Sequence, residues 1–140
     1  MKKLLSAVLA AAMLTSTLPT ALAVSDIENH WAKPYLLEME DLGVIKPSST
    51  TGEFTPNQAI ERWEFMRYVN RAFGFTETTN ISFSDVPSNS LYYETVQIAV
   101  KYGYINGVGN NKMDPEGTLT REQAATILGR LHKYTPSASL

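Results

Sequence analysis

The sequence predicts an all-α fold made of two copies of one helix–loop–helix unit. The first observation is an internal repeat, in which Arg62 and Arg121 occupy matching places 59 positions apart. The second is that apolar residues recur at helical spacing in both copies. The third is the pair Thr120 and Gln123, which forms a capping box directly before an apolar run and therefore marks the start of a helix.

Residues 1–23 are predicted to be a secretory signal peptide. Lys2 and Lys3 precede an apolar run over residues 4–14, and the small-residue sequence Ala-Leu-Ala follows at residues 21–23. That run is too short for a stable membrane span, and no later segment is long enough, so we expect no membrane span after cleavage. Removing these two lysines from the 12 basic residues, with all 14 acidic residues kept, leaves a formal charge of −4. This balance argues against nucleic acid as a partner.

The repeat divides the rest of the chain into modules. We assign residues 24–73 to the first, 74–82 to a polar linker, 83–133 to the second and 134–140 to a short tail that contains no start of a third copy. The absence of cysteine fits a bacterial envelope better than a small disulfide-rich extracellular domain.

The first helix of each module is predicted over residues 32–42 and 91–102. In the second module one helical face consists of Val96, Ala99, Val100 and Gly103. The matching face of the first module, Leu36, Met39, Glu40 and Gly43, is less apolar because it contains a glutamate. Gly43 and Gly103 are expected to end these helices in the left-handed conformation.

The second helices are expected to begin near residues 61 and 120, after loops over residues 44–59 and 104–118 that are rich in Gly, Asn, Pro, Ser and Thr. The predicted core stripe of the earlier helix is Phe65, Met66, Val69 and Ala72. That of the later helix is Ala124, Ala125, Leu128 and Leu131. The two stripes are expected to face a shared core.

Short motifs recur in the same order in both copies. The second copy reads Phe-Ser-Asp-Val at residues 83–86, Gly-Tyr-Ile-Asn-Gly at 103–107, Met-Asp-Pro at 113–115 and Leu-Thr-Arg-Glu-Gln at 119–123. The first copy reads Asp-Ile at 26–27, His-Trp-Ala at 30–32, Gly-Val-Ile at 43–45, Phe-Thr-Pro at 54–56 and Ile-Glu-Arg-Trp-Glu at 60–64. With these motifs each copy resembles an S-layer homology (SLH) module.

The resemblance implies both an architecture and a function. SLH modules usually assemble in threes as a pseudo-trimer, so two modules would form a partial pseudo-threefold bundle. The family anchors exported proteins to the bacterial cell wall by binding secondary cell-wall polysaccharides, which are often pyruvylated. Ligand is expected in grooves between neighbouring modules, in contact with the signature arginine and with residues near the module start.

The two signature arginines lie where a helix normally disfavours them. A cation in the first turn meets the positive end of the helix dipole and costs from a few tenths to about 1 kcal/mol. The free N–H groups of that turn, together with a guanidinium, would however bind a carboxylate such as that of a pyruvyl ketal. The alternative is a structural pairing of each arginine with an internal acid, Asp26 or Asp85.

The resemblance therefore suggests a set of glycan-binding residues. In the second module they are Arg121, Thr120, Asp85, Tyr92, Gly103 and Gly107, and in the first Arg62, Asp26, Trp31 and Glu64. The second module is the better candidate, because Glu61 replaces the usual threonine beside Arg62 and adds a negative charge. The aromatic residues of the set could stack on a sugar or cover the core, and its glycines could admit a ligand or serve turn geometry alone.

No catalytic or metal-binding pattern is recognisable. His30 and His132 lack a metal-ligand spacing, and residues 106–116 lack the order of a calcium loop. We therefore expect no enzyme activity, metal or cofactor. The leading hypothesis is a secreted protein of the cell wall and surface that binds wall polysaccharide. The alternative is an assembly or adaptor subunit that completes a bundle with itself or with another SLH-containing envelope protein.

Overall fold

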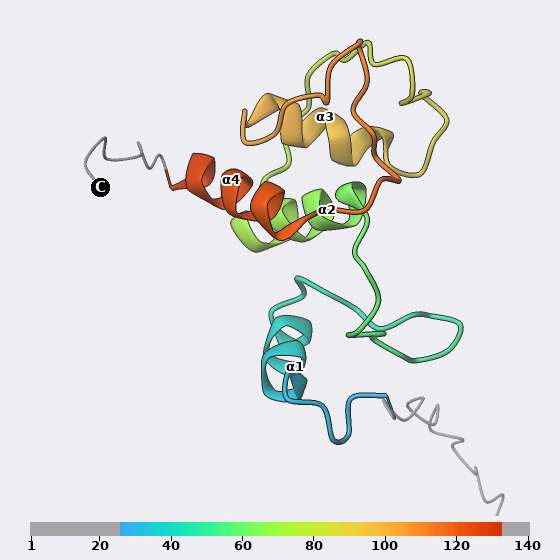
Figure 1. Ribbon diagram of the computed structural model, residues 1–140, viewed down its shortest axis with the longest axis vertical. Helices are drawn as coiled ribbons and strands as arrows, with labels where there is room; N and C mark the ends of the chain where they lie inside the picture. The colour runs from blue at the N-terminus through green and yellow to red at the C-terminus, as the bar shows by residue number, and fades with distance from the viewer. Residues whose placement is uncertain (1–25, 133–140) are drawn as a thin grey trace, which may run out of the picture.

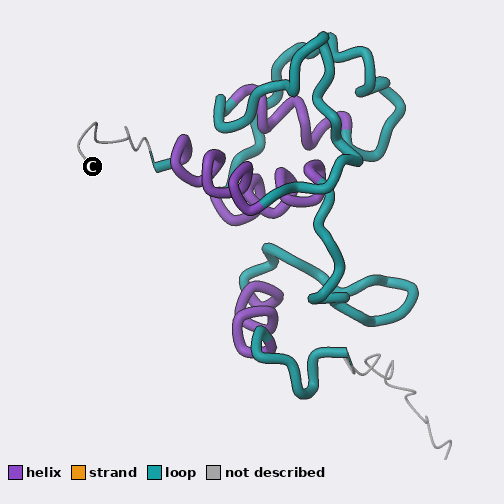
Figure 2. Tube along the Cα trace, in the orientation of Figure 1, coloured by secondary structure: helices purple, strands orange, loops and turns teal. Residues whose placement is uncertain are grey.

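The computed structural model describes residues 26–132, which form four α-helices and no β-sheet. The helices are α1 (Lys33–Asp41), α2 (Arg62–Phe73), α3 (Tyr93–Lys101) and α4 (Arg121–Leu131), as Figure 1 shows. The all-α prediction is confirmed, and the helices alternate with long loops as expected (Figure 2). The predicted signal peptide and tail lie outside the described residues. The partial threefold bundle remains a prediction.

The local signals at the helix ends are confirmed. Gly43 and Gly103 follow α1 and α3 with φ angles of +71° and +70°, the left-handed conformation expected of a helix end. At α4, the Thr120 hydroxyl accepts the N–H of Gln123 at 3.2 Å. The Thr120 N–H donates in return to the Gln123 side chain at 3.1 Å, which completes the capping box.

Helix α2 packs across the module boundary, against the helix and loop of the second repeat. Among the helices of residues 26–132, α2 and α3 are the pair whose backbones lie close together. The main hydrophobic core is formed by residues of α2, of the second repeat and of α4, and includes Met66, Val69, Val96, Ala99, Tyr104, Ile105, Met113 and Ile127. Most of this core belongs to the second repeat, and the first repeat contributes α2.

A buried polar group fixes α2 in this position. The Tyr104 hydroxyl lies 2.6 Å from the Asn70 side-chain oxygen and 3.1 Å from the Met66 carbonyl. The Asn70 amide donates to the Thr95 carbonyl of α3 at 3.1 Å. Burial raises the pKa of Tyr104 above its ordinary range, so the hydroxyl keeps its proton and remains a donor.

The predicted core stripe of α4 is wrong in part. Ala124 and Leu131 pack against the core, but Ala125 and Leu128 are exposed, and Ile127, which the prediction omitted, is buried. Helix α4 therefore presents a different face to the core from the one that the sequence predicts. In α2 the stripe is correct for Met66 and Val69, which are buried, and for Phe65, which packs partly buried against the core, whereas Ala72 is exposed near the C-terminal end of the helix.

The segment that contains α1 stands apart from the main core. Figure 1 shows α1 and its loop joined to the other three helices by an extended stretch before α2. Helix α1 buries none of its residues, although Ile27, Val44 and Ile45 next to it are buried. The apolar face predicted for α1 thus lacks a helix packed against it within the described part of the chain.

Candidate functional site

Arg62 is buried between the two repeats. Its side chain belongs to the first turn of α2, and the residue is only 5% exposed. The Nε atom donates to the Met113 carbonyl at 3.1 Å, and Nη2 donates to the Asn106 carbonyl at 3.3 Å. Burial lowers the pKa of Arg62, an effect that the charge of Asp114 partly offsets. The acceptors are backbone carbonyls of the second repeat, so Arg62 joins the repeats together.

The backbone donors at the start of α2 are also used internally. The N–H of Arg62 donates to the Gly117 carbonyl at 3.0 Å, and that of Trp63 donates to the Pro115 carbonyl at 2.9 Å. Glu61 does not cap the helix; its carboxylate accepts the indole N–H of Trp63 instead. The loop of the second repeat therefore covers the N-terminus of α2 and leaves the N–H groups of Arg62 and Trp63 unavailable to an external anion.

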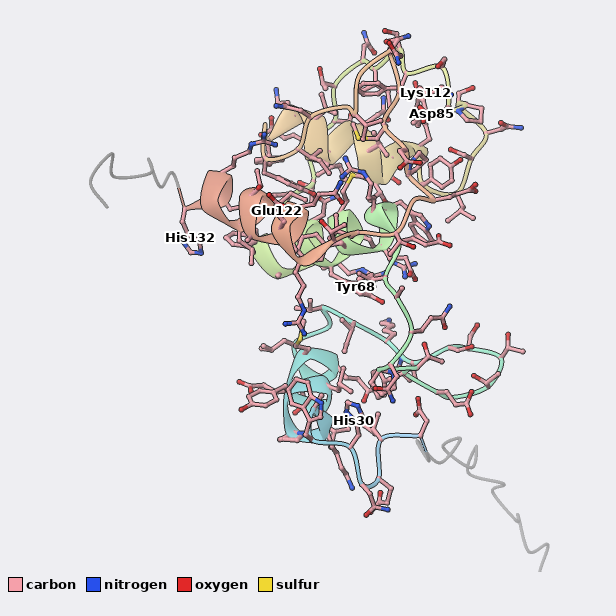
Figure 3. The ribbon with its side chains drawn as sticks, in the orientation of Figure 1. His30, Tyr68, Asp85, Lys112, Glu122 and His132 are labelled. Atoms are coloured by element: carbon pink, nitrogen blue, oxygen red, sulfur yellow. The ribbon has the colours of Figure 1, made fainter. Side chains whose placement is uncertain are left out.

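The matching end of α4 has a different environment. Arg121 is exposed, and its guanidinium makes no hydrogen bond or ion pair with any residue between 26 and 132. Thr120 and Gln123 cap each other, but the first-turn N–H groups of Arg121 and Glu122 have no acceptor in the same part of the chain. Figure 3 places Glu122 on this open first turn. The start of α4 thus offers a guanidinium and two N–H groups to a ligand.

Asp26 and Asp85 hold the loop of their own repeat. Asp85 accepts the N–H groups of Met113 and Asp114 at 2.9 and 2.8 Å, and Asp26 accepts those of residues 54–55 at 3.2 and 2.6 Å. The structural alternative of an ion pair between these acids and the two arginines is not formed within residues 26–132. Arg62 is nonetheless structural, with carbonyls as its partners.

The bonds to Asp85 predict a specific acid sensitivity. Burial alone would raise the pKa of Asp85, but the N–H groups of Met113 and Asp114, and the neighbouring Lys112 (Figure 3), outweigh it and lower the pKa below its ordinary 3.8. A carboxyl with a lowered pKa in the native state stabilises the fold above its ordinary pKa, and this contribution is lost as the pH falls further. Asp85→Asn should therefore be less stable at neutral pH and should lose less stability on acidification.

This can be measured as the melting temperature between about pH 6 and about pH 2.5. Glu116→Gln, which removes an exposed acid of the same loop, is the matched control and should follow the wild type. An Asp85→Asn variant with the same acid dependence as the wild type would contradict the assignment.

The other candidate residues differ in accessibility. Trp31 is 79% exposed, whereas Tyr92 is 8% exposed and packs in the core beside Trp63. Gly103 serves a left-handed turn, and at Gly107 a Cβ atom would lie 2.6 Å from the Lys112 carbonyl, so backbone packing requires glycine there. Trp31 is therefore exposed, with its ring beside those of His30 and Tyr35, whereas Tyr92 belongs to the core.

A cavity of about 410 Å³ lies between the first-repeat segment and α2. Its apolar wall on the first repeat includes Leu36, Met39, Ile45 and Phe54, and α2 contributes Glu64 and Tyr68. Figure 3 shows Tyr68 on the side of α2 that faces this segment. Glu64 also pairs with Arg67 at 3.5 Å. Sequence reasoning did not predict this cavity, although the stripe of Leu36 and Met39 was a signal for it.

Two other kinds of site are absent from the described residues. Between residues 26 and 132 there is no helix long and apolar enough to cross a membrane. The same residues contain no group of three or more histidine and carboxylate side chains arranged to hold a metal ion.

Comparison with known proteins agrees with the repeat. The profile of the S-layer homology domain matches residues 25–66 and again residues 82–125. The Surface-layer 125 kDa protein of Lysinibacillus sphaericus is 31% identical over 98 residues, covering 70% of this chain and 8% of that protein. The Middle cell wall protein of Brevibacillus brevis is 26% identical over 149 residues, which cover 98% of this chain and 14% of the Brevibacillus protein.

Other similar proteins are named as enzymes, among them a xylanase and an exoglucanase. The Amylopullulanase of Thermoanaerobacterium thermosulfurigenes is 30% identical over 110 residues, covering 78% of this chain but 6% of the enzyme. The chain thus spans between 6% and 14% of the length of these three relatives. The surface-layer and cell-wall relatives support a location at the cell surface. Two tandem matches, in register with the repeat and its helices, show that the chain belongs to the S-layer homology domain family.

Proposed function

We propose that this protein is a secreted, non-catalytic component of the cell surface that holds to the bacterial cell wall by binding a wall polysaccharide. Membership of the S-layer homology family and the similarity to surface-layer and cell-wall proteins support this function. The ligand class that best fits the chain's own residues is a polysaccharide with carboxylate substituents, such as pyruvyl ketals.

The open start of α4 is the observation that carries the proposal. A carboxylate there would receive the guanidinium of Arg121 and the N–H groups of Arg121 and Glu122, which have no acceptor within residues 26–132. Charge-assisted hydrogen bonds of this kind are among the stronger polar contacts in proteins. The capping box of Thr120 keeps the first turn formed while these N–H groups remain available. At α2, Arg62 and its neighbours already bind internal carbonyls.

Co-sedimentation with cell walls tests the proposal. The purified protein is mixed with wall sacculi that carry their secondary polymer and, in parallel, with sacculi from which the polymer has been chemically stripped. We expect the protein to pellet with intact sacculi and to remain in solution with stripped ones. Equal pelleting with both preparations would refute binding to the polymer.

A further inference from the structure

Helix α4 exposes the face that α2 uses to join the two repeats. In α2 this face consists of Arg62, Met66 and Val69, all buried. The residues 59 positions later are Arg121, Ala125 and Leu128, all exposed, with Leu128 44% exposed. They follow the same helical spacing and lie in the same order along one face. The chain therefore carries a second copy of this interface face, which no other described residue covers.

The surface that would receive this face is also present and uncovered. In the second repeat, α2 packs on a surface formed by Val96, Ala99, Ile105 and Met113, all buried. Their counterparts in the first repeat, 59 or 60 positions earlier, are Leu36, Met39, Ile45 and Phe54, which line the 410 Å³ cavity. Ala99 is fully buried, whereas its counterpart Met39 is 36% exposed. The cavity therefore lies where the first repeat lacks the helix that the second repeat receives from α2.

We propose that α4 of one molecule docks in the first-repeat cavity of a second copy of this chain. The packing of α2 on the second repeat is the template for this contact. In that arrangement Arg121 would donate to the carbonyls of Phe54 and Lys46 of the second copy, the counterparts of Met113 and Asn106. The first-turn N–H groups of α4 would meet the carbonyls of residues 56 and 58, the counterparts of Pro115 and Gly117.

A paired change between the repeats agrees with this docking. Inside the chain, the Tyr104 hydroxyl is matched by the Asn70 side chain of α2. At the proposed contact the corresponding residues are Val44 and Gly129, so both halves of the polar pair are replaced together. A Cβ atom added at Gly129 would meet nothing within 4 Å. A tyrosine or asparagine buried at this contact without its hydrogen-bond partner would destabilise it, and neither residue is present there.

The contact is head-to-tail, because each molecule offers one α4 face and one cavity. Such contacts produce closed rings or open chains. The docked α4 would also use the groups that the proposed function assigns to a carboxylate, so the second copy and the polysaccharide compete at this end of the molecule.

The mass of the purified chain in solution, measured by light scattering over a concentration series without polysaccharide, tests the proposal. We expect a mass that rises with concentration. Leu128→Asp on α4 and Met39→Asp in the cavity should each weaken self-association by about tenfold or more. The decisive sample is their mixture. Leu128→Asp retains an intact cavity and Met39→Asp an intact α4 face, so together they should form a dimer that grows no further.

Both substituted residues are at least partly exposed, and circular dichroism checks that each variant is folded. Val108→Asp, a change of the same kind at an exposed loop residue, should assemble like the wild type. A strictly monomeric wild type, a mixture that stays monomeric, or equal loss of assembly in Val108→Asp would overturn the proposal. The wall-binding experiment uses a separate readout, so polysaccharide binding and self-association can fail independently.

Discussion

Arg62→Ala is expected to lower the free energy of unfolding by about 2–4 kcal/mol. The guanidinium is buried and donates to the carbonyls of Met113 and Asn106, so its removal leaves both without their donor and opens a void between α2 and the second repeat. Met113 is fully buried, and a buried acceptor that loses its donor costs about 1–3 kcal/mol, whereas water can replace the donor at the exposed Asn106. Urea unfolding at low protein concentration, followed by circular dichroism, measures this change.

Arg121→Ala is the matched control, because it removes the same side chain from the equivalent turn of α4. Arg121 is exposed and makes no polar contact in residues 26–132, so the variant should stay within about 0.5 kcal/mol of the wild type. Equal stabilities of the two variants would show that Arg62 does not join the repeats.

Local signals in the sequence were sufficient to predict the helices and their ends. Gly43 and Gly103 adopt the left-handed conformation, and Thr120 with Gln123 forms the capping box. These features depend on neighbouring residues alone: a glycine after an apolar stripe, or an acceptor three residues before its donor. The 59-residue repeat predicts the order of the four helices, because equivalent sequences fold into equivalent helices.

The environments of equivalent residues could not be predicted in the same way. The repeat places Arg62 and Arg121 in equivalent turns, and Glu61 favours Arg121 as the ligand-binding residue, but neither signal predicts that Arg62 is buried and Arg121 exposed. The partners of Arg62 are backbone carbonyls, which every residue possesses, so no side chain marked them in the sequence. The stripe containing Leu128 was expected to be buried by analogy with Val69, but it lacks the surface that Val69 packs on.

Arg121→Ala is expected to weaken pelleting with polymer-bearing cell walls by about tenfold or more. The loss of hydrogen bonds from a charged donor to a carboxylate is worth about 1.5–3 kcal/mol, which corresponds to a factor between roughly 10 and 150 in the dissociation constant. Arg121→Lys keeps the charge but loses the planar pair of donors, so its binding should be intermediate. Arg62→Ala, measured at a temperature at which it remains folded, should weaken pelleting less.

The charge itself needs a control, because a wall polymer with many carboxylates attracts any cation. Arg130→Ala removes an exposed arginine from the last turn of the same helix and changes the net charge by the same amount. If Arg121 binds a carboxylate through the open first turn of α4, Arg130→Ala should pellet nearly as well as the wild type. Equal losses in the two variants would mean that the polymer is attracted by the net charge of α4 alone. The assignment of Arg121 as a specific carboxylate ligand would then be wrong.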